Sequence, residues 1–364
     1  MSRHIFFVSP ENLTPTGGVN VMFQSAEILD EQGWSSSVHF QSSDYTYTHY
    51  PSRVKTSYTV FPNDFRDVGV LRGVGRKPGR WSSERRKPRR PGANHFRTPG
   101  RSDLVVLPDF WISSQVPRFS GLPTAILAQD VFGSIRGSLG PMARGKAVPQ
   151  DFRGFITTSK ASQAAVRAFG NGAHYHVPLF LGDTEFAFHE SKKRQICFMP
   201  RRRNDEVVAM TTFLKSRVEN LGFDLVPIEG MSWAEVRRTM AESLIFLSFS
   251  RREGFGLPPA EAMAMGCLTI GYTGVGGDEY FTPDIAFPVP EDNFVAFYNQ
   301  VVSVLERYVA EPGPLDEMRK RASERILTTY TRPNTTSALV TAMERMTASN
   351  VASDVLMQGE EHFV

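Results

Sequence analysis

Residues 244–279 have the sequence LIFLSFSRREGFGLPPAEAMAMGCLTIGYTGVGGDE. The apolar run Leu244–Ser250 predicts a buried strand, and a loop with two glycines follows it. A helix is predicted over Pro258–Met265, because proline suits the first helical turn, where its missing N–H has no intrahelical partner. Cys267–Tyr272 predicts the next strand. The order strand, glycine loop, helix, strand is typical of a parallel α/β sheet.

The loop Glu253–Leu257 has the features of a phosphate site. Ligands of open parallel sheets bind where strands end and helices begin. The two glycines let the backbone approach a ligand, and the free N–H groups and positive end of the following helix favour an anion. Glu261, predicted in the first turn of that helix, is placed to accept hydrogen bonds from a ribose diol. Glu253 is expected to face a hexose at the other end of the same ligand.

The same alternation extends through the chain. A strand at His4–Val8 is followed by a glycine loop and by a helix over Val19–Gln32, whose apolar residues have helical spacing. Further strands are predicted at 37–40, 103–108, 123–128, 154–158 and 173–177, and then at 195–199, 223–227, 244–250 and 267–272. We therefore predict an α/β protein with two Rossmann-like domains.

Changes in composition suggest the domain boundaries. A charged stretch around 179–194 predicts a linker between an N-terminal domain at 1–180 and a second domain at 190–335. A helical segment at 336–364 ends the chain. Within the first domain, residues 71–101 are rich in Gly, Pro, Ser and Arg and have almost no apolar residues, which predicts a disordered or exposed insertion.

The basic charge is concentrated in that insertion. Residues 72–101 contain eleven Lys or Arg and one acidic residue, Glu84, a net charge of +10, whereas the whole chain has +3. Four interpretations stay open: a solvated insertion, contact with an anionic membrane surface, a shifted reading frame, and contact with nucleic acid. Membrane contact is worth about 1 kcal/mol per basic residue near the surface. Nucleic acid is least favoured, because no nucleic-acid module is recognisable.

The rest of the composition is that of a soluble enzyme, with a mean hydropathy of −0.26. No run approaches the roughly 20 apolar residues of a membrane span, and Ile5–Val8 is too short for the apolar region of a signal peptide. We expect a cytoplasmic protein. The basic segment leaves open a peripheral contact with the inner face of the membrane. Cys197 and Cys267 each lie in an apolar run, so both are expected to be reduced core residues.

Glu253 and Glu261, with seven residues between them, resemble the E-x7-E motif of the retaining GT-B glycosyltransferases of family 4. Gly17-Gly18 resembles the glycine pair of the family's first loop, Phe198–Arg201 its strand end with a phosphate-binding arginine, and Gly274–Glu279 its glycine-rich loop ending in an acid. The resemblance covers most of the chain and is clearest in the C-terminal half. It implies a GT-B fold: two Rossmann-like domains facing a cleft, with a C-terminal helix crossing back to the first domain.

The resemblance also implies an activity. A sugar would pass from a nucleoside diphosphate sugar to a hydroxyl of a glycan or lipid-linked glycan, with retention of configuration. Glu261 would hold the ribose and Glu253 the donor sugar. The donor-binding residues that it implies, besides the arginines, are Gly17, Gly18, Gly254, Phe255, Gly256, Leu257 and Glu261. No cofactor is expected, and since no D-x-D motif is present, no catalytic metal either.

Two cations are expected on the diphosphate. The resemblance gives Arg201 as the first, whereas the family usually has a lysine a few residues further on. This chain has Arg202 and Arg203 instead, and the spacing favours Arg203. Guanidinium binds diphosphate bidentately, and fixed positive groups that stabilise a leaving group are typically the largest catalytic contribution.

The acceptor side departs from the family. Many members have a histidine after a strand of the first domain, where this chain has Gln129 and Asp130. We expect Asp130, with Glu253 and Arg201, to be catalytic, although an aspartate there is also typical of a helix cap. Asp109, at another strand end, is a further candidate. Alternative functions are a nucleotide-sugar epimerase or phosphorylase, and a non-catalytic nucleotide-sugar-binding or membrane-adaptor protein.

Overall fold

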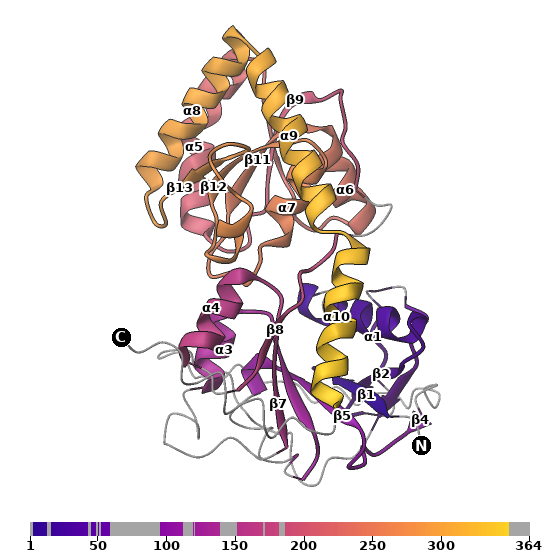
Figure 1. Cartoon of the computed structure of the whole chain (residues 1–364). Coiled ribbons are helices and arrows are strands. Elements are labelled where there is room, and N and C mark those ends of the chain that lie inside the picture. Colours follow the sequence, from indigo (N-terminus) through magenta and orange to yellow (C-terminus); the bar gives the residue numbers. More distant parts are fainter. Residues whose placement is uncertain are drawn as a thin grey trace, which may run out of the picture. The chain divides into compact units, whose positions relative to one another are not determined.

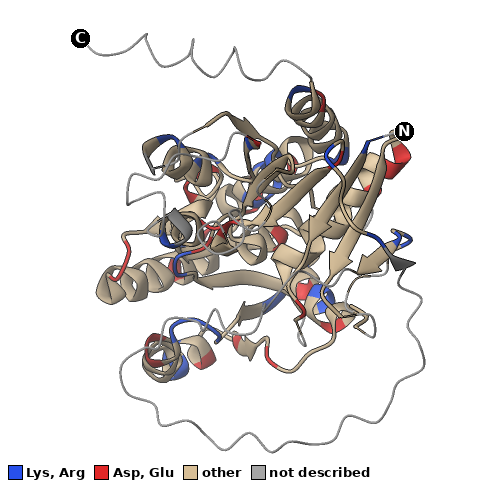
Figure 2. Ribbon diagram, turned by 90° about the horizontal axis from the view of Figure 1, so that it is seen from below, with Lys and Arg blue, Asp and Glu red and all other residues tan. Residues whose placement is uncertain are grey.

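The computed structural model describes residues 3–12, 16–42, 45–48, 50, 52–58, 95–111, 119, 121–138, 151–169, 172–181 and 186–348 (Figure 1). Most of the predicted basic insertion, residues 71–94, lies outside the described residues, as does the end of the predicted C-terminal segment, residues 349–364. In the part that is described, basic and acidic residues are interspersed over helices and loops (Figure 2).

The first sheet has eight strands in the order β4-β3-β2-β1-β5-β6-β7-β8. They are β1 His4–Val8, β2 Ser35–Phe40, β3 Thr56–Tyr58, β4 His95–Phe96, β5 Leu104–Pro108, β6 Thr124–Ala128, β7 Phe152–Thr157 and β8 His174–His176. Neighbouring strands are parallel in the pairs β4–β3, β3–β2, β2–β1, β1–β5, β5–β6 and β7–β8. Strands β1, β5 and β6 are buried throughout, as apolar strands of a parallel sheet should be. Strand β4 lies inside the stretch predicted to be unstructured.

The helices associated with these strands are α1 (Gly17–Glu31), α3 (Val131–Ser138) and α4 (Lys160–Phe169), with a short 3-10 helix, η1, at Asp109–Trp111. The apolar stripe predicted for α1 is confirmed, since all its members are buried: Val19, Met22, Phe23, Ala26 and Leu29. The helix begins two residues earlier than predicted.

The second sheet has five parallel strands in the order β10-β9-β11-β12-β13. They are β9 Lys193–Phe198, β10 Asp224–Pro227, β11 Ser243–Phe249, β12 Leu268–Tyr272 and β13 Phe287–Val289. Helices α5 (Asn204–Asn220) and α8 (Phe294–Ala310) lie on one side of this sheet, and α6 (Trp233–Glu242) and α9 (Gly313–Thr329) on the other (Figure 1). The remaining elements are α7 (Leu257–Ala264), the 3-10 helix η4 (Gly276–Glu279) and α10 (Arg332–Thr347).

This sheet has a core of its own. Val207, Met210, Leu214 and Val218 form one face of α5, at helical spacing, and belong to a buried apolar cluster that draws all its members from residues 196–315. Phe249, Tyr272 and Phe297 bring β11, β12 and α8 together through ring contacts with centroids 5.0 to 5.1 Å apart. The two parallel sheets with their helices confirm the prediction of two Rossmann-like domains.

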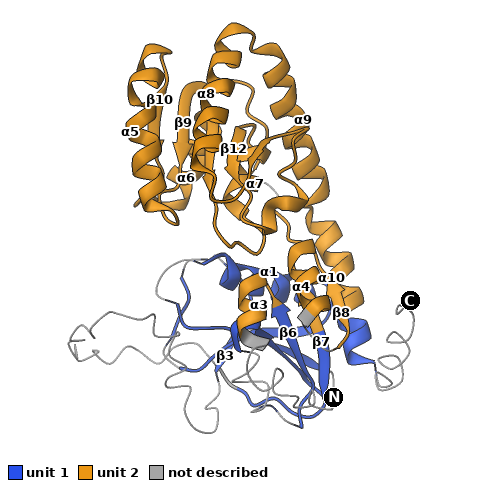
Figure 3. Cartoon of the chain, turned by 90° about the vertical axis from the view of Figure 1, so that its left-hand side faces the viewer, with its two compact units in different colours: residues 1–127, 137–154, 343–364 blue, residues 128–136, 155–342 orange. Residues whose placement is uncertain are grey.

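By their contacts, the residues form two compact units (Figure 3). Unit 1 comprises residues 1–127, 137–154 and 343–364, and unit 2 comprises residues 128–136 and 155–342. Unit 2 thus contains β8 and α4 as well as the whole second sheet. Among the described residues, no helix combines the length and the apolar character that a membrane span requires.

Candidate functional site

A pocket lies at the carboxyl ends of β9 and β11 in the second sheet. After β9 the chain continues to β10 on one side, and after β11 it continues to β12 on the other. The two connections leave in opposite directions, so the loops after β9 and β11 diverge. Open parallel sheets bind ligands at such a topological switch point. The lining residues are Met199, Arg201, Arg202, Phe246, Leu247, Ser248, Phe249, Ser250, Glu253, Pro258 and Pro259. Arg201 and Glu253, predicted from separate motifs, are thus brought together.

Two glycine loops meet beside this pocket, backbone against backbone. The Glu253 N–H donates to the Gly274 carbonyl at 2.9 Å, and the Gly276 N–H donates to the Glu253 carbonyl at 3.1 Å. A Cβ added to Gly276 would lie 2.3 Å from the carbonyl carbon and oxygen of Gly254. A side chain at Gly276 is therefore excluded, and the loops after β11 and β12 form one joined structure.

Helix α7 begins at this junction. Its N-cap, Gly256, has a φ of +85°, a conformation that favours glycine. The buried Tyr280 hydroxyl donates to the Gly256 carbonyl, and burial raises the pKa of Tyr280, so the phenol stays protonated as a donor. Proline occupies the first turn of α7, as predicted. The N-terminal end of α7 is thereby fixed at the edge of the pocket.

Glu261 lies deeper in α7 than predicted. It is the fifth residue of the helix and not part of the first turn, because the helix begins at Leu257. The residue as a whole is 6% exposed, and it is engaged in interactions within the protein. Glu253 is more accessible: its side chain is 21% exposed and pairs with Arg202, with 3.0 Å between Nε and Oε1. This ion pair lies on the pocket wall.

Arg203 does not line the pocket with Arg201 and Arg202. Its side chain is 3% exposed, and its guanidinium pairs with Glu206 at 2.8 Å, with Glu291 at 2.5 Å and with Asp292. Burial acts to lower the pKa of Arg203, but the hydrogen bonds to Glu206 and Asp292 outweigh it and the pKa is raised. A diphosphate would reach this guanidinium only by displacing carboxylates. Arg202 is the cation adjacent to Arg201 that the pocket does expose.

Backbone strain is concentrated at the same sheet edge. Among the described residues, the non-glycine residues with positive φ are Arg252, Val275 and Asp292, and all three follow strands of the second sheet. Val275 has φ 74° and ψ −56°, a strained γ-turn conformation that is a true outlier for a β-branched residue. Strain of this kind persists only where surrounding contacts hold it, and it is typical of functional sites.

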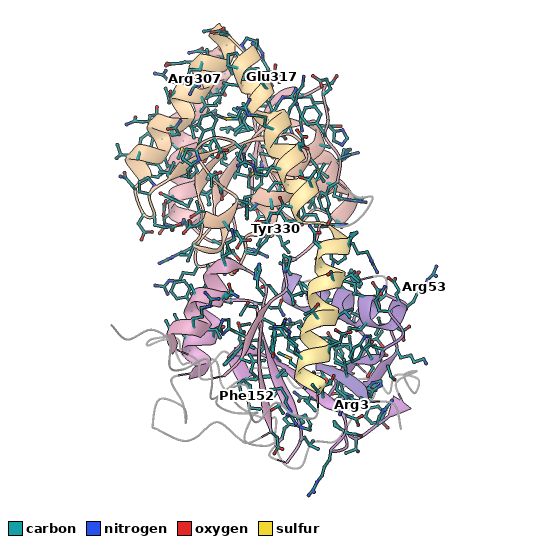
Figure 4. The ribbon with its side chains drawn as sticks, viewed as in Figure 1. Arg3, Arg53, Phe152, Arg307, Glu317 and Tyr330 are labelled. Atoms are coloured by element: carbon teal, nitrogen blue, oxygen red, sulfur yellow. The ribbon has the colours of Figure 1, made fainter. Side chains whose placement is uncertain are left out.

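The glycine-rich loop ends in a carboxylate with two partners. Glu279 accepts hydrogen bonds from the Lys160 N–H at 2.6 Å and from the Tyr330 hydroxyl at 2.9 Å, all within unit 2. Tyr330 lies between α9 and α10 (Figure 4). Its pKa is raised, mainly by burial and in addition by the negative charge of Glu279. The sequence did not identify Tyr330, because nothing in its neighbourhood marks it as a loop contact.

The predicted acceptor-side residues, and the predicted donor contacts Gly17 and Gly18, are divided between the two units. Asp130 accepts from the Phe132 N–H at 3.0 Å and pairs with Arg136 at 3.4 Å, which are the contacts of a capping residue of α3. The carbonyl oxygen of Gln129, also in unit 2, lies 1.6 Å from where a Cβ of Gly254 would be. Asp109 is buried at the end of β5 in unit 1. Gly17 and Gly18 are the first residues of α1, also in unit 1.

Four further residues at this edge of the sheet are not marked by any motif in the sequence. Glu291 and Asp292 follow β13, and Glu206 and Tyr272 lie on α5 and β12. They come from segments far apart in the chain, so no local spacing connects them. As to metals, the described residues contain no group of three or more His, Cys, Asp or Glu that could hold an ion.

Sequence comparison finds a match in the same half of the chain. A family model described as "Glycosyl transferase-like" matches residues 219–340, roughly a third of the chain, which includes both glycine loops. An alpha-1,6-glucosyltransferase of Actinobacillus pleuropneumoniae serotype 7 (strain AP76) is 32% identical over 119 residues, 32% of this chain and 36% of the relative. The chain therefore matches about a third of the length of that relative.

Solved structures match nearly the whole chain. Sucrose-phosphate synthase from Thermosynechococcus elongatus superposes with a TM-score of 0.63, covering 94% of this chain and 99% of that one, at 14% identity. The pneumococcal O-GlcNAc transferase GtfA, solved with UDP and GlcNAc, gives a TM-score of 0.62 over 95% of this chain and 99% of that one, at 11% identity. At these identities the likeness establishes the fold alone, and it confirms the predicted GT-B class.

Proposed function

We propose that the chain is a glycosyltransferase that moves a sugar from a nucleoside diphosphate sugar to a hydroxyl of a glycan or lipid-linked glycan, with retention and without a catalytic metal. The observation that carries the proposal is the pocket at the switch point of the second sheet, where Arg201, Arg202 and Glu253 meet. The glycosyl transferase-like match over residues 219–340 supports it independently.

In the proposed reaction, the bond between the anomeric carbon and the diphosphate oxygen breaks, and a bond to the acceptor oxygen forms. The acceptor proton leaves with the diphosphate or with a base. Negative charge grows on the leaving diphosphate, and Arg201, Arg202 and the amides of Gly254 to Leu257 would stabilise it. Glu261 would hold the ribose, and Glu253 would hold the donor sugar once it exchanges its Arg202 partner for sugar hydroxyls.

Asp130 stays a proposed catalytic residue on the acceptor side, and Gly17 and Gly18 stay proposed donor contacts. Both assignments come from the family resemblance. The capping contacts of Asp130 engage both of its carboxylate oxygens with α3, so a catalytic role would require at least one of those contacts to break.

Release of nucleoside diphosphate from a panel of UDP-, GDP-, ADP- and dTDP-sugars, with and without glycan acceptors, tests the function. We expect turnover with one donor class, and a loss of roughly 100-fold in kcat/KM for Arg201→Ala, about 2.7 kcal/mol of transition-state stabilisation. Arg238→Ala removes an exposed arginine of α6 and is the matched control. Donor binding without release would favour a non-catalytic binding protein, and a changed sugar on an intact nucleotide would favour an epimerase.

A cytoplasmic location stays a proposal, and the basic segment adds to it a peripheral contact with anionic membrane. Deletion of residues 72–90 removes most of its charge and stops before β4, which pairs with β3. We expect weaker binding to vesicles containing anionic lipid, with vesicles of neutral lipid as the control. Equal binding by both proteins would remove the membrane from the proposal.

A further inference from the structure

Arg203 is the buried centre of an ionic cluster that joins four strand ends of the second sheet. We infer that Arg203 is a positioning residue, which holds the two glycine loops of the pocket in place, and that it is not itself a ligand of the donor. The cluster consists of Arg203, Glu206, Ser250, Tyr272, Glu291 and Asp292. The consequence for catalysis rests on the proposed function, but the positioning role does not.

The first part of the argument is the number of partners. The Nε of Arg203 donates to the Ser250 carbonyl, just after β11, at 3.1 Å. Its terminal nitrogens bind Glu206, Glu291 and Asp292. The guanidinium carbon lies 4.2 Å from the centroid of the Tyr272 ring, at the end of β12. A planar guanidinium can satisfy several fixed acceptors at once, whereas a lysine ammonium presents a single point charge.

The second part is a hydrogen-bond path to the pocket. Glu291 binds Arg203 through Oε2 and accepts from the Gly274 N–H through Oε1 at 3.0 Å. Gly274 in turn accepts from the Glu253 N–H at 2.9 Å. Arg203 therefore reaches the pocket residue Glu253 through two intermediates, although Arg203 does not itself line the pocket. On the Ser250 side it also holds the residue at which the loop Arg251–Leu257 begins.

The third part is strain. Asp292, held directly by Arg203, and Val275, which follows Gly274, both have positive φ. Such conformations carry a conformational cost and relax when their contacts are lost. The ion pairs of Arg203 offset that cost on Asp292, and the contact of Glu291 with Gly274 offsets it on Val275. Loss of the guanidinium should therefore release both loops together.

Hydrogen exchange in ligand-free protein tests the inference without any donor. In Arg203→Lys we expect peptides covering residues 250–256 and 273–280 to exchange at least about tenfold faster than in the wild type, because their amides lose the contacts that order them. A peptide covering α6 should be unchanged. Arg194→Lys, at the opposite end of β9, is the matched control and should leave both loops protected.

Glu291→Gln is the second variant, for the case in which Arg203→Lys fails to fold. It keeps an amide oxygen of similar shape as an acceptor for Gly274 but loses the ion pair, so we expect faster exchange confined to residues 273–280. Unchanged exchange in both variants would overturn the positioning role.

Binding of UDP, measured by calorimetry, separates the two roles. Arg201→Ala should weaken UDP binding while leaving loop exchange as in the wild type. If Arg203→Lys has wild-type loop exchange and yet binds UDP more weakly, Arg203 is a donor ligand and the inference is wrong. A wild-type protein that neither binds nor turns over any nucleotide would refute the proposed function, while the exchange result would still decide the role of Arg203.

Discussion

The glycines of the two joined loops are set by the close approach of their backbones. Gly276 lies against the carbonyl group of Gly254, with no room for a Cβ. By contrast, Gly313, the first residue of α9, would have no atom within 4 Å of an added Cβ. A side chain is therefore excluded at Gly276 by its surroundings, whereas Gly313 has space for one.

Gly276→Ala is expected to lower the free energy of unfolding by about 2 kcal/mol or more, because the loops must separate to admit the methyl group. Gly313→Ala, the control, should be neutral or slightly stabilising, since alanine restricts the unfolded chain. Urea unfolding measures both. Equal stabilities of the two variants would show that the loops adjust without cost.

Val275→Gly should relieve backbone strain. A glycine accepts φ 74° without a steric penalty, which removes about 1 to 3 kcal/mol, although its greater freedom in the unfolded chain costs roughly 0.5 to 1 kcal/mol. We expect a melting temperature equal to or above that of the wild type. Val289→Gly, in buried β13, should be clearly destabilised. A large loss of stability in Val275→Gly would mean that its side chain matters more than its strain.

At the scale of elements, strands β1, β2 and β3 share a buried polar network. The ring of His4 contacts the hydroxyls of Ser35 at 2.7 Å and Ser37 at 2.8 Å. The ring of His39 contacts the hydroxyl of Ser57 at 2.7 Å. Burial lowers the pKa of both histidines to about 4, with further lowering from Arg97 at His4 and from His4 at His39.

This network predicts a loss of stability in mild acid. Both histidines have an ordinary pKa of 6.5 in the unfolded chain and about 4 in the folded protein, so the unfolded state binds more protons between these values. The free energy of unfolding should therefore fall as pH drops from 6.5 towards 4, by about 1.4 kcal/mol per pH unit and histidine. Urea unfolding at pH 7, 6 and 5 measures this. His39→Gln should have a shallower pH dependence, and a pH-independent wild type would contradict the prediction.

At the scale of the whole molecule, the second sheet has an apolar core that is independent of the first sheet. Every member of that buried cluster comes from residues 196–315. We expect a fragment of residues 187–331 to fold alone, because a domain with its own core is stable in isolation. Cooperative urea unfolding of the fragment, followed by circular dichroism and by tryptophan fluorescence with coincident transitions, would confirm it. A gradual transition would show that the second sheet depends on the rest of unit 2.

The sequence by itself predicted an alternation of strands and helices and two Rossmann-like domains, because hydrophobic periodicity and glycine or proline punctuation are local. The GT-B class came from the family resemblance, and the short strands β3, β4 and β13 were not predicted. The sequence also singled out the pocket residue Glu253, which follows a strand whose carboxyl end can be found from the sequence, and the family resemblance added Arg201. It misplaced the start of α7 by one residue, and therefore put Glu261 in the first turn, because helix ends depend on caps such as Gly256.

Only the tertiary structure decided which arginine faces the pocket. Arg201, Arg202 and Arg203 are consecutive and chemically alike, and the spacing of the motif favoured Arg203. The fold instead surrounds Arg203 with carboxylates from α5 and from the loop after β13. Glu206 is only three residues away, but Glu291 and Asp292 lie 88 and 89 residues away, so their attraction arises only when the strand ends of the parallel sheet come together. Long-range charge pairing, which no local pattern shows, thus distinguishes Arg203 from the two arginines that line the pocket.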